Sequence, residues 1–229
     1  MTKPDDPRPA IRIVAPLVAT VALMLLVRWR MPAVAGAVGT LLVLTPSLMA
    51  SIAVLCVFSI YWSVAAKDSK PPESSESKTS RCFHLLVINA GVLLLIFSVP
   101  GLTRRLLPAS HGFQISGLLL EAAGFALAVW SRRTLGSNWS GEVRIAAGHQ
   151  LVRSGPYRVV RHPIYTAILT MYCGIMVVSG EMHALLAFAA IALAYWRKLR
   201  MEETALAAAF GDEFAAWRQK TGALLPPLF

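Results

Sequence analysis

The residues best suited to chemistry lie together in one polar stretch, residues 151–165, with the sequence LVRSGPYRVVRHPIY. It combines three arginines, two tyrosines and one histidine. Gly155 and Pro156 indicate a turn, because glycine accepts a positive φ and proline fixes φ. Pro163 disfavours the α region at His162 and is a good first residue for a helix. The stretch therefore predicts a basic loop at a membrane surface, able to hold an anionic or zwitterionic small molecule.

A carboxylate on an apolar helical stripe is the second candidate for chemistry. The stripe repeats at helical spacing through Leu206, Phe210, Phe214 and Trp217. Glu202 lies one turn before this stripe and on the same face, so it needs a partner. One possible partner is Lys198, in an i,i+4 ion pair worth a few tenths of a kcal/mol. The other is a bound ligand with hydroxyl or ammonium donors, and the residues leave both open.

The composition is that of a polytopic membrane protein. Of the 229 residues, 56% are apolar and 15% are charged, whereas soluble domains carry about 25% charged residues. Several uncharged runs approach or reach the ~17–25 residues that a spanning helix requires. The net charge of +10 fits basic residues that flank spans and meet anionic lipid. Nucleic acid is not an expected partner, because no nucleic-acid-binding pattern is present in the sequence.

Several other kinds of site are absent from the sequence. Cys56, Cys82 and Cys173 form no CxxC pair, so neither a disulfide framework nor a zinc site is predicted. The five histidines show no HExxH pattern, and no metal site is expected. A G-x-G-x-x-G motif and a P-loop are missing as well, which excludes a nucleotide domain of the soluble type.

The apolar runs predict an all-α bundle of membrane helices followed by a cytoplasmic C-terminal helix. We expect about six spans, with five or seven also possible because residues 31–66 are ambiguous around Pro46. A short glycine-rich piece, 33–45, could be re-entrant or part of a broken helix. Glu121 lies inside a predicted span, where it is either functional or part of a hydrogen bond between helices. The predicted spans are 11–27, 47–66, 82–99, 113–130, 164–178 and 182–195.

The distribution of cations predicts the orientation. The loop 131–162 carries six arginines, and five cations follow the last span, whereas the turn 179–181 carries none. The positive-inside rule places that loop and the tail in the cytoplasm. Counting the spans back from that loop puts the polar segment 67–81 inside and Arg104 and Arg105 outside. The outside position of these two arginines is not favoured by the positive-inside rule.

The linked motifs carry a resemblance to a known family. HQLVRSGPYRVVRHPIY, two closely spaced spans and then RMEETALAAAFGDEF resemble the isoprenylcysteine carboxyl methyltransferase family. They also resemble the wider group of integral-membrane methyltransferases that includes phospholipid N-methyltransferases. The resemblance covers about residues 130–229. It implies a catalytic region, 113–229, with the cytoplasmic loop 131–162, the helical hairpin 164–195 and the C-terminal helix, preceded by N-terminal transmembrane helices in 1–112.

The resemblance implies S-adenosylmethionine as cofactor and a methyl acceptor that arrives from the membrane. His162 would be a cofactor contact first and a general base second, because no dyad partner is visible in the sequence. Lys198 stands where the family has an acceptor-side arginine, Glu142 where eukaryotic members usually have glutamine, and Ala167 where a glycine is usual. By position, the cofactor contacts would be Glu142, His149, Gln150, Leu151, Val152, Tyr157, His162, Pro163, Ile164, Tyr165 and Glu202.

The acceptor and the enzyme class leave alternatives. A carboxylate on an isoprenylcysteine-like thioether is the family default, and a phospholipid amine or another small lipophilic acceptor is the alternative. A membrane sterol reductase that binds NADPH is a further alternative, although its typical R-D-x-x-x-C-x-x-K-Y ending is missing. A transporter would show paired helix interruptions, and only the one at Pro46 is seen. Membrane lipid is an expected partner in each case.

Overall fold

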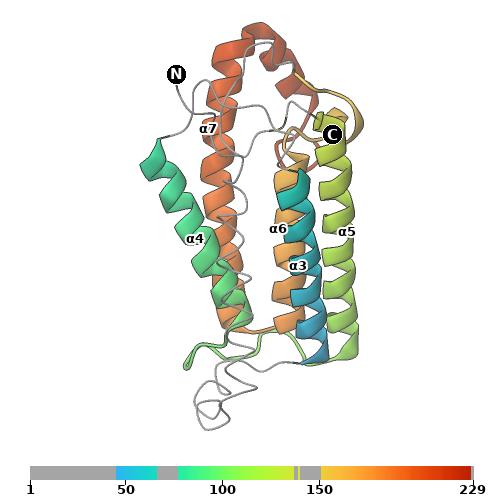
Figure 1. Cartoon of the computed structure of the whole chain (residues 1–229), viewed down its shortest axis with the longest axis vertical. Coiled ribbons are helices and arrows are strands. Elements are labelled where there is room, and N and C mark those ends of the chain that lie inside the picture. Colours follow the sequence, from blue (N-terminus) through green and yellow to red (C-terminus); the bar gives the residue numbers. More distant parts are fainter. Residues whose placement is uncertain (1–44, 66–76, 137–138, 140–150, 228–229) are drawn as a thin grey trace.

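The computed structural model describes residues 45–65, 77–136, 139 and 151–227. In these parts the protein is helical, without β-strands (Figure 1). The predicted span 11–27 and the glycine-rich piece 33–45 lie outside the described residues, apart from Thr45. The helices are α3 Pro46–Ala65, α4 Lys78–Ile96, α5 His111–Leu135, the 3-10 helix η3 Gly155–Arg158, α6 Pro163–Ser179 and α7 Met182–Lys220.

The ends of α4 and α5 are set by small capping residues. Ser77 and Ser110 accept hydrogen bonds from the main-chain N–H groups of Ser80 and Phe113, which satisfies free donors at the helix starts. Gly136, at φ +56°, ends α5. The prediction that a loop begins at Ser131 is therefore wrong at its start. The helix continues past its apolar run because nothing before Gly136 stops it.

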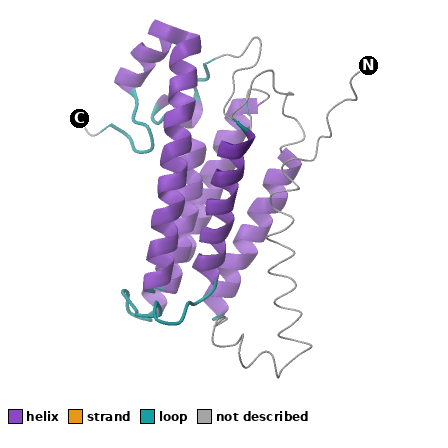
Figure 2. Ribbon diagram, turned by 90° about the vertical axis from the view of Figure 1, so that its left-hand side faces the viewer, coloured by secondary structure: helices purple, strands orange, loops and turns teal. Residues whose placement is uncertain are grey.

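The starts of α6 and α7 place the candidate residues. His162 has φ −123° and ψ 59° and Pro163 is the first residue of α6, which confirms the predicted turn into a helix. α7 is 39 residues long and continues from its apolar first half into the segment with the glutamates. At Gly211 its backbone is non-helical, with φ 48° and ψ −121°. The end of α7 consequently folds back over the other helices (Figures 1 and 2).

Close packing of α5 on α6 fixes the frame of the bundle. A Cβ added at Gly117 would lie 2.6 Å from the carbonyl oxygen of Gly174, and one at Gly124 would lie 2.7 Å from that of Ala167. These distances are too short for any side chain, so the two backbones touch only because the residues are small. Small residues serve the same purpose between membrane helices in general.

The buried carboxylate of Glu121 joins α3 to this pair. Ser51 of α3 donates a hydrogen bond of 2.5 Å to Oε1 of Glu121, and both residues are fully buried. The expectation of a hydrogen bond between helices at this position is confirmed. The bond connects α3 to the same face of α5 that packs on α6.

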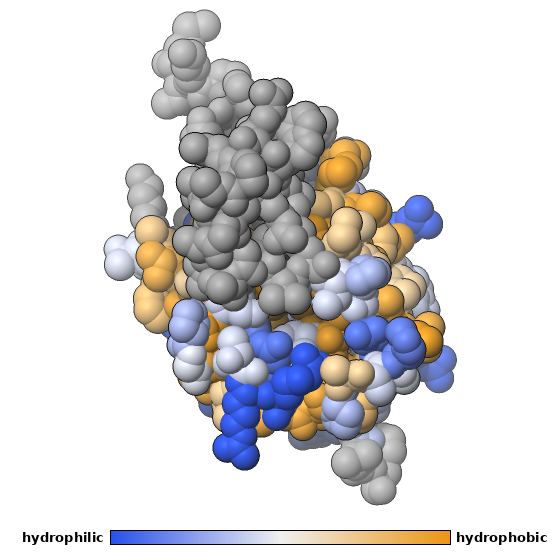
Figure 3. Space-filling view, turned by 90° about the horizontal axis from the view of Figure 1, so that it is seen from below, coloured by the Kyte–Doolittle hydropathy of each residue, from blue (hydrophilic) through white to orange (hydrophobic). Residues whose placement is uncertain are grey.

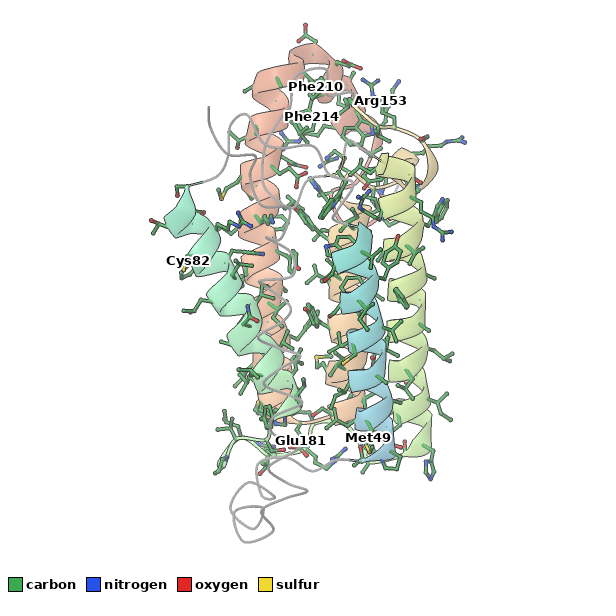
Figure 4. The ribbon with its side chains drawn as sticks, viewed as in Figure 1. Met49, Cys82, Arg153, Glu181, Phe210 and Phe214 are labelled. Atoms are coloured by element: carbon green, nitrogen blue, oxygen red, sulfur yellow. The ribbon has the colours of Figure 1, made fainter. Side chains whose placement is uncertain are left out.

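The two ends of the bundle carry different connections. At one end, Arg105 forms an isolated bridge with Glu181, and their side chains lie 3.4 Å apart (Figure 4). Figure 3 views the molecule from this end, where hydrophilic and apolar residues share the described surface. At the other end, Arg132 donates to the carbonyl oxygen of Ala65, so the ends of α5 and α3 meet. The alternation of ends along the chain agrees with the predicted parity.

Among the described residues, three helices are long and apolar enough to cross a membrane, namely Pro46–Ala65, the Thr79–Ile96 part of α4, and His111–Leu135. A shorter apolar helix is Pro163–Ser179. Several of the predicted spans therefore correspond to helices, with ends shifted by capping. The count of six stays a prediction, since the first span lies outside the described residues.

Candidate active site

Residues from the start of α6 and the second half of α7 meet at one end of the bundle. The hydroxyl of Tyr165 donates a hydrogen bond of 2.6 Å to Oε2 of Glu202. Nδ1 of His162 lies 3.7 Å from the same oxygen. The rings of His162 and Tyr165 stack at 5.4 Å with an interplanar angle of 5°. The fold thus gathers three of the predicted cofactor residues around one carboxylate oxygen.

The two adjacent glutamates of α7 differ in accessibility. The side chain of Glu202 is 34% exposed, whereas that of Glu203 is 9% exposed. Glu202 can therefore still reach a bound molecule, while Glu203 is enclosed by protein. Glu202 is therefore available for binding, whereas Glu203 has a structural role.

Glu203 forms a buried ion pair with Arg161. Nε of Arg161 donates to Oε1 of Glu203 at 2.8 Å, and Nε2 of His162 lies 3.5 Å from the same oxygen. Burial alone would raise the pKa of Glu203. The interactions with His162 and Arg161 outweigh burial and lower that pKa to about 2. Glu203 is therefore a carboxylate at neutral pH, and it lies beside His162 in a position that the sequence did not reveal.

The apolar stripe of α7 packs on the loop that leads to His162. Tyr157, Phe214 and Trp217 form a buried cluster, and Nε1 of Trp217 donates to the carbonyl oxygen of Tyr157 at 3.2 Å. Phe210 and Phe214 lie where α7 folds back (Figure 4). The predicted stripe is confirmed. Its partly buried members and neighbours are Leu135, Leu151, Val152, Leu206 and Phe210.

Tyr157 belongs electrostatically to the same site. Burial, and next the charge of Glu202, raise the pKa of its hydroxyl, while Arg132 acts in the opposite direction. The phenol is therefore neutral at physiological pH. It can act as a hydrogen-bond donor or an aromatic surface, but not as a base.

Arg132 and Trp139 form a platform beside the site that the sequence did not single out. The guanidinium of Arg132 lies 4.6 Å from the centre of the Trp139 ring and donates to the carbonyl oxygen of Gly136 at 2.7 Å. Trp139 in turn meets Trp62 of α3 edge to face at 5.4 Å. The platform joins the ends of α3 and α5 below the loop.

The remaining predicted residues fall into three groups. Pro163 and Ile164 are buried in the first turn of α6, where they shape the site through packing. Lys198 is half-buried and lies one turn before Glu202 on α7. Outside the described residues lie Glu142, His149 and Gln150.

The donor set suits a small cationic or hydroxyl-bearing molecule. Glu202 offers a carboxylate, and the ring of Tyr165 offers an aromatic face that attracts cations. In the described part of the chain, no group of three His, Cys, Asp or Glu side chains could hold a metal ion.

Comparison with known proteins gives three findings. Residues 113–213 match the sequence family described as phospholipid methyltransferase. The cobalt-zinc-cadmium resistance protein CzcN of Cupriavidus metallidurans is 37% identical over 120 residues, which make up 51% of this chain and 53% of that protein. The chain thus spans about half the length of this curated relative. A solved structure of the eukaryotic intramembrane Ras methyltransferase ICMT is similar over 95% of this chain and 97% of that chain, with a TM-score of 0.43 and 16% identity.

The family match includes nearly all of α5, η3, α6 and most of α7, and so contains the described residues of the candidate site except Trp62, Phe214 and Trp217. The resemblance to membrane methyltransferases that the motifs carry is confirmed for this part of the chain.

Proposed function

We propose that this chain, whose residues 113–213 match the phospholipid methyltransferase family, is an integral-membrane methyltransferase that uses S-adenosylmethionine. The observation that carries the proposal is the meeting of Tyr165, His162 and Glu202 around one accessible carboxylate oxygen. Tyr165 and His162 lie 37 or more positions before Glu202 in the sequence, yet the resemblance assigns all three residues to one cofactor.

The residues present fit S-adenosylmethionine. The carboxylate of Glu202 can accept hydrogen bonds from ribose hydroxyls or from an ammonium group. The face of the Tyr165 ring can lie against a sulfonium cation. Leu151, Val152 and the buried Tyr157 provide an apolar wall beside them. When bound, S-adenosylmethionine supplies a methyl group that is activated by its positive sulfur.

The protein's own part is to hold and orient, since methyl transfer to a carboxylate needs little acid–base help. Tyr165 fixes the rotamer of Glu202 through its hydrogen bond. His162 holds the aromatic stack in place at the start of α6. Positioning and exclusion of water then lower the barrier, as in other reactions dominated by orientation.

The acceptor that we propose is lipophilic and enters from the membrane. The first candidate is the carboxylate of an isoprenylcysteine-like molecule, with Lys198, one turn before Glu202 on α7, as the cation that would face it. A phospholipid amine is the second candidate, favoured by the family that residues 113–213 match. Lysine lacks the bidentate fork of arginine, so a carboxylate would be held less strictly here.

Binding of cofactor to the detergent-solubilised full chain tests the proposal. We expect calorimetric titration with S-adenosylmethionine to give saturable binding and titration with NADPH to give none. Binding of NADPH alone would identify a reductase and contradict the proposal. Incubation of membranes with methyl-labelled S-adenosylmethionine and either S-farnesyl-N-acetylcysteine or phosphatidylethanolamine then separates the two acceptors.

A further inference from the structure

The segment that follows α7, residues 221–225, lies against the chain that enters α6. We call it the C-terminal segment. Its backbone satisfies groups of the loop that would otherwise have no partner in this irregular region. Three main-chain hydrogen bonds join them: Gly222 N to Val159 O at 3.3 Å, Arg161 N to Gly222 O at 2.8 Å, and His162 N to Ala223 O at 3.1 Å.

A side-chain bond extends this contact into α6. Oγ1 of Thr166 donates to the carbonyl oxygen of Leu224 at 2.6 Å. The C-terminal segment therefore contacts the residues immediately before His162, His162 itself and the first turn of α6. Its position affects where the imidazole lies.

The guanidinium of Arg161 connects the C-terminal segment to α7. Nε donates to Glu203, while Nη1 donates to the carbonyl oxygen of Arg218 at 3.2 Å and also to the carbonyl oxygen of Thr221. The side chain is only 7% exposed. Lysine cannot reproduce this set of bonds, because it lacks the planar array of donors. Arg161 thus links Glu203, the neighbour of Glu202, to the C-terminal segment through hydrogen bonds.

We propose that Arg161 and Glu203 are positioning residues which hold the C-terminal segment against His162, and that this segment is a necessary part of the cofactor site. The inference rests on the proposed function. Glu203 lies beside Glu202 on one turn of α7, and its Oε1 lies 3.5 Å from His162 Nε2. A displacement of the Arg161–Glu203 pair would therefore move the adjacent residues His162 and Glu202, which both contact Tyr165.

Gly222 gives a way to disturb the segment without changing any charge. A Cβ added there would overlap the carbonyl oxygen of Leu225, so the tight turn accepts only glycine. Gly222→Ala should displace the C-terminal segment while leaving Arg161, Glu203 and the helices unchanged.

The test compares four variants of the full chain in detergent: Arg161→Lys, Glu203→Gln, Gly222→Ala and a truncation after Lys220. The control is Arg153→Lys, which changes an exposed arginine that pairs with Glu213. The affinity for S-adenosylmethionine is measured by calorimetry, and the imidazole signals of His162 are followed by NMR with labelled histidine. We expect each of the four to weaken binding by about tenfold or more and to shift the His162 signals. The control should leave both unchanged.

Helical content and melting temperature identify variants that fail to fold. If Glu203→Gln or the truncation fails to fold, the test rests on Gly222→Ala and Arg161→Lys. Folded variants that bind within about twofold of the unsubstituted protein, with unshifted His162 signals, would overturn the inference. If the unsubstituted protein itself binds no S-adenosylmethionine, the proposed function fails. The shift of the His162 signals still reports whether Arg161 and Glu203 position this residue.

Discussion

Glu202 and Glu203 are neighbours in sequence but have opposite surroundings. Glu202 keeps a third of its side chain exposed and takes a hydrogen bond from Tyr165. Glu203 is buried against Arg161. The sequence alone suggests Glu203 as a mild control for substitutions at Glu202. The structure shows that it is unsuitable, because breaking a buried ion pair leaves an uncompensated charge.

Glu202→Gln should weaken the binding of S-adenosylmethionine. Loss of a charge-assisted hydrogen bond costs about 1.5–3 kcal/mol, or roughly ten- to a hundredfold in affinity. The melting temperature without ligand should hardly change, since about a third of the Glu202 side chain is exposed. Calorimetry and thermal melting measure the two quantities. Glu213→Gln, on an exposed part of α7, is the matched control, and equal small effects of the two substitutions would remove Glu202 from the site.

Glu203 should make the stability depend on acid pH. Its pKa is lowered to about 2 in the folded protein, while an unfolded glutamate titrates near 4.3. Its contribution is therefore complete above about pH 5 and is lost as the pH falls towards 2. Unfolding midpoints in a non-ionic detergent should fall more steeply between pH 6 and pH 3 for the unsubstituted protein than for Glu203→Gln. Identical slopes would show that the carboxylate is not stabilised by Arg161.

Among the elements, α5 and α6 form the frame on which the site is mounted. Gly117, Gly124 and Gly174 allow backbone contact, and His162 and Tyr165 sit at the start of the same α6. Any separation of these helices would displace the aromatic stack. Glycine is therefore used here for its size and not for its backbone freedom.

Gly124→Ala should destabilise the protein. The added methyl group would lie 2.7 Å from a carbonyl oxygen and 2.9 Å from a main-chain nitrogen, and overpacking of this kind typically costs about 1–3 kcal/mol. A lower melting temperature in detergent is the expected result. Gly112→Ala is the control, because the nearest atom there is 3.8 Å away. Equal melting temperatures for the two variants would mean that the helices can separate without cost.

The sequence predicts the helices well and their ends poorly. Apolar runs locate α3 to α7, because the membrane requires uninterrupted apolar length. The end of α5 depends on the cap at Gly136, and the change of direction in α7 depends on the non-helical backbone of Gly211, which hydropathy does not report.

Within the site, the resemblance assigns Tyr165 and Glu202 to one cofactor, and the structure joins these two side chains by a hydrogen bond. The Arg161–Glu203 ion pair could not be predicted, because either of two adjacent glutamates could have faced the arginine, and the choice depends on the rotation of α7. The contacts of residues 221–224 with the loop are main-chain bonds, and these leave no mark in the residue types. A glycine at position 222 was the one available signal.

At the scale of the molecule, the connections fall on two opposite ends. The site lies at the end where α3 and α5 finish, and the Arg105–Glu181 contact lies at the other. The excess of cations in the loop 131–162 and after residue 196 predicts that the site's end faces the cytoplasm. This orientation remains a prediction.

Cysteine labelling checks the orientation. Cys56, Cys82 and Cys173 are first replaced by serine, and a single cysteine is placed at exposed Gln219 or at exposed Ala109. We expect a membrane-impermeant maleimide added to intact cells to label Ala109→Cys. Gln219→Cys should react only after permeabilisation. Labelling of Gln219→Cys in intact cells would show that the orientation is opposite to the predicted one. Gly222 is avoided, because a side chain there would disturb the C-terminal segment.

The unbroken course of α7 from Met182 to the glutamates has a mechanical consequence. Glu202 follows the apolar first half of α7, which is predicted to lie in lipid, while Tyr165 belongs to a second helix, α6. Helices tilt when lipid thickness does not match their apolar length. The separation of the two groups should therefore respond to acyl-chain length. Cofactor affinity in phosphatidylcholine vesicles should peak at one chain length and decline with both shorter and longer lipids, so binding would report the thickness of the surrounding membrane.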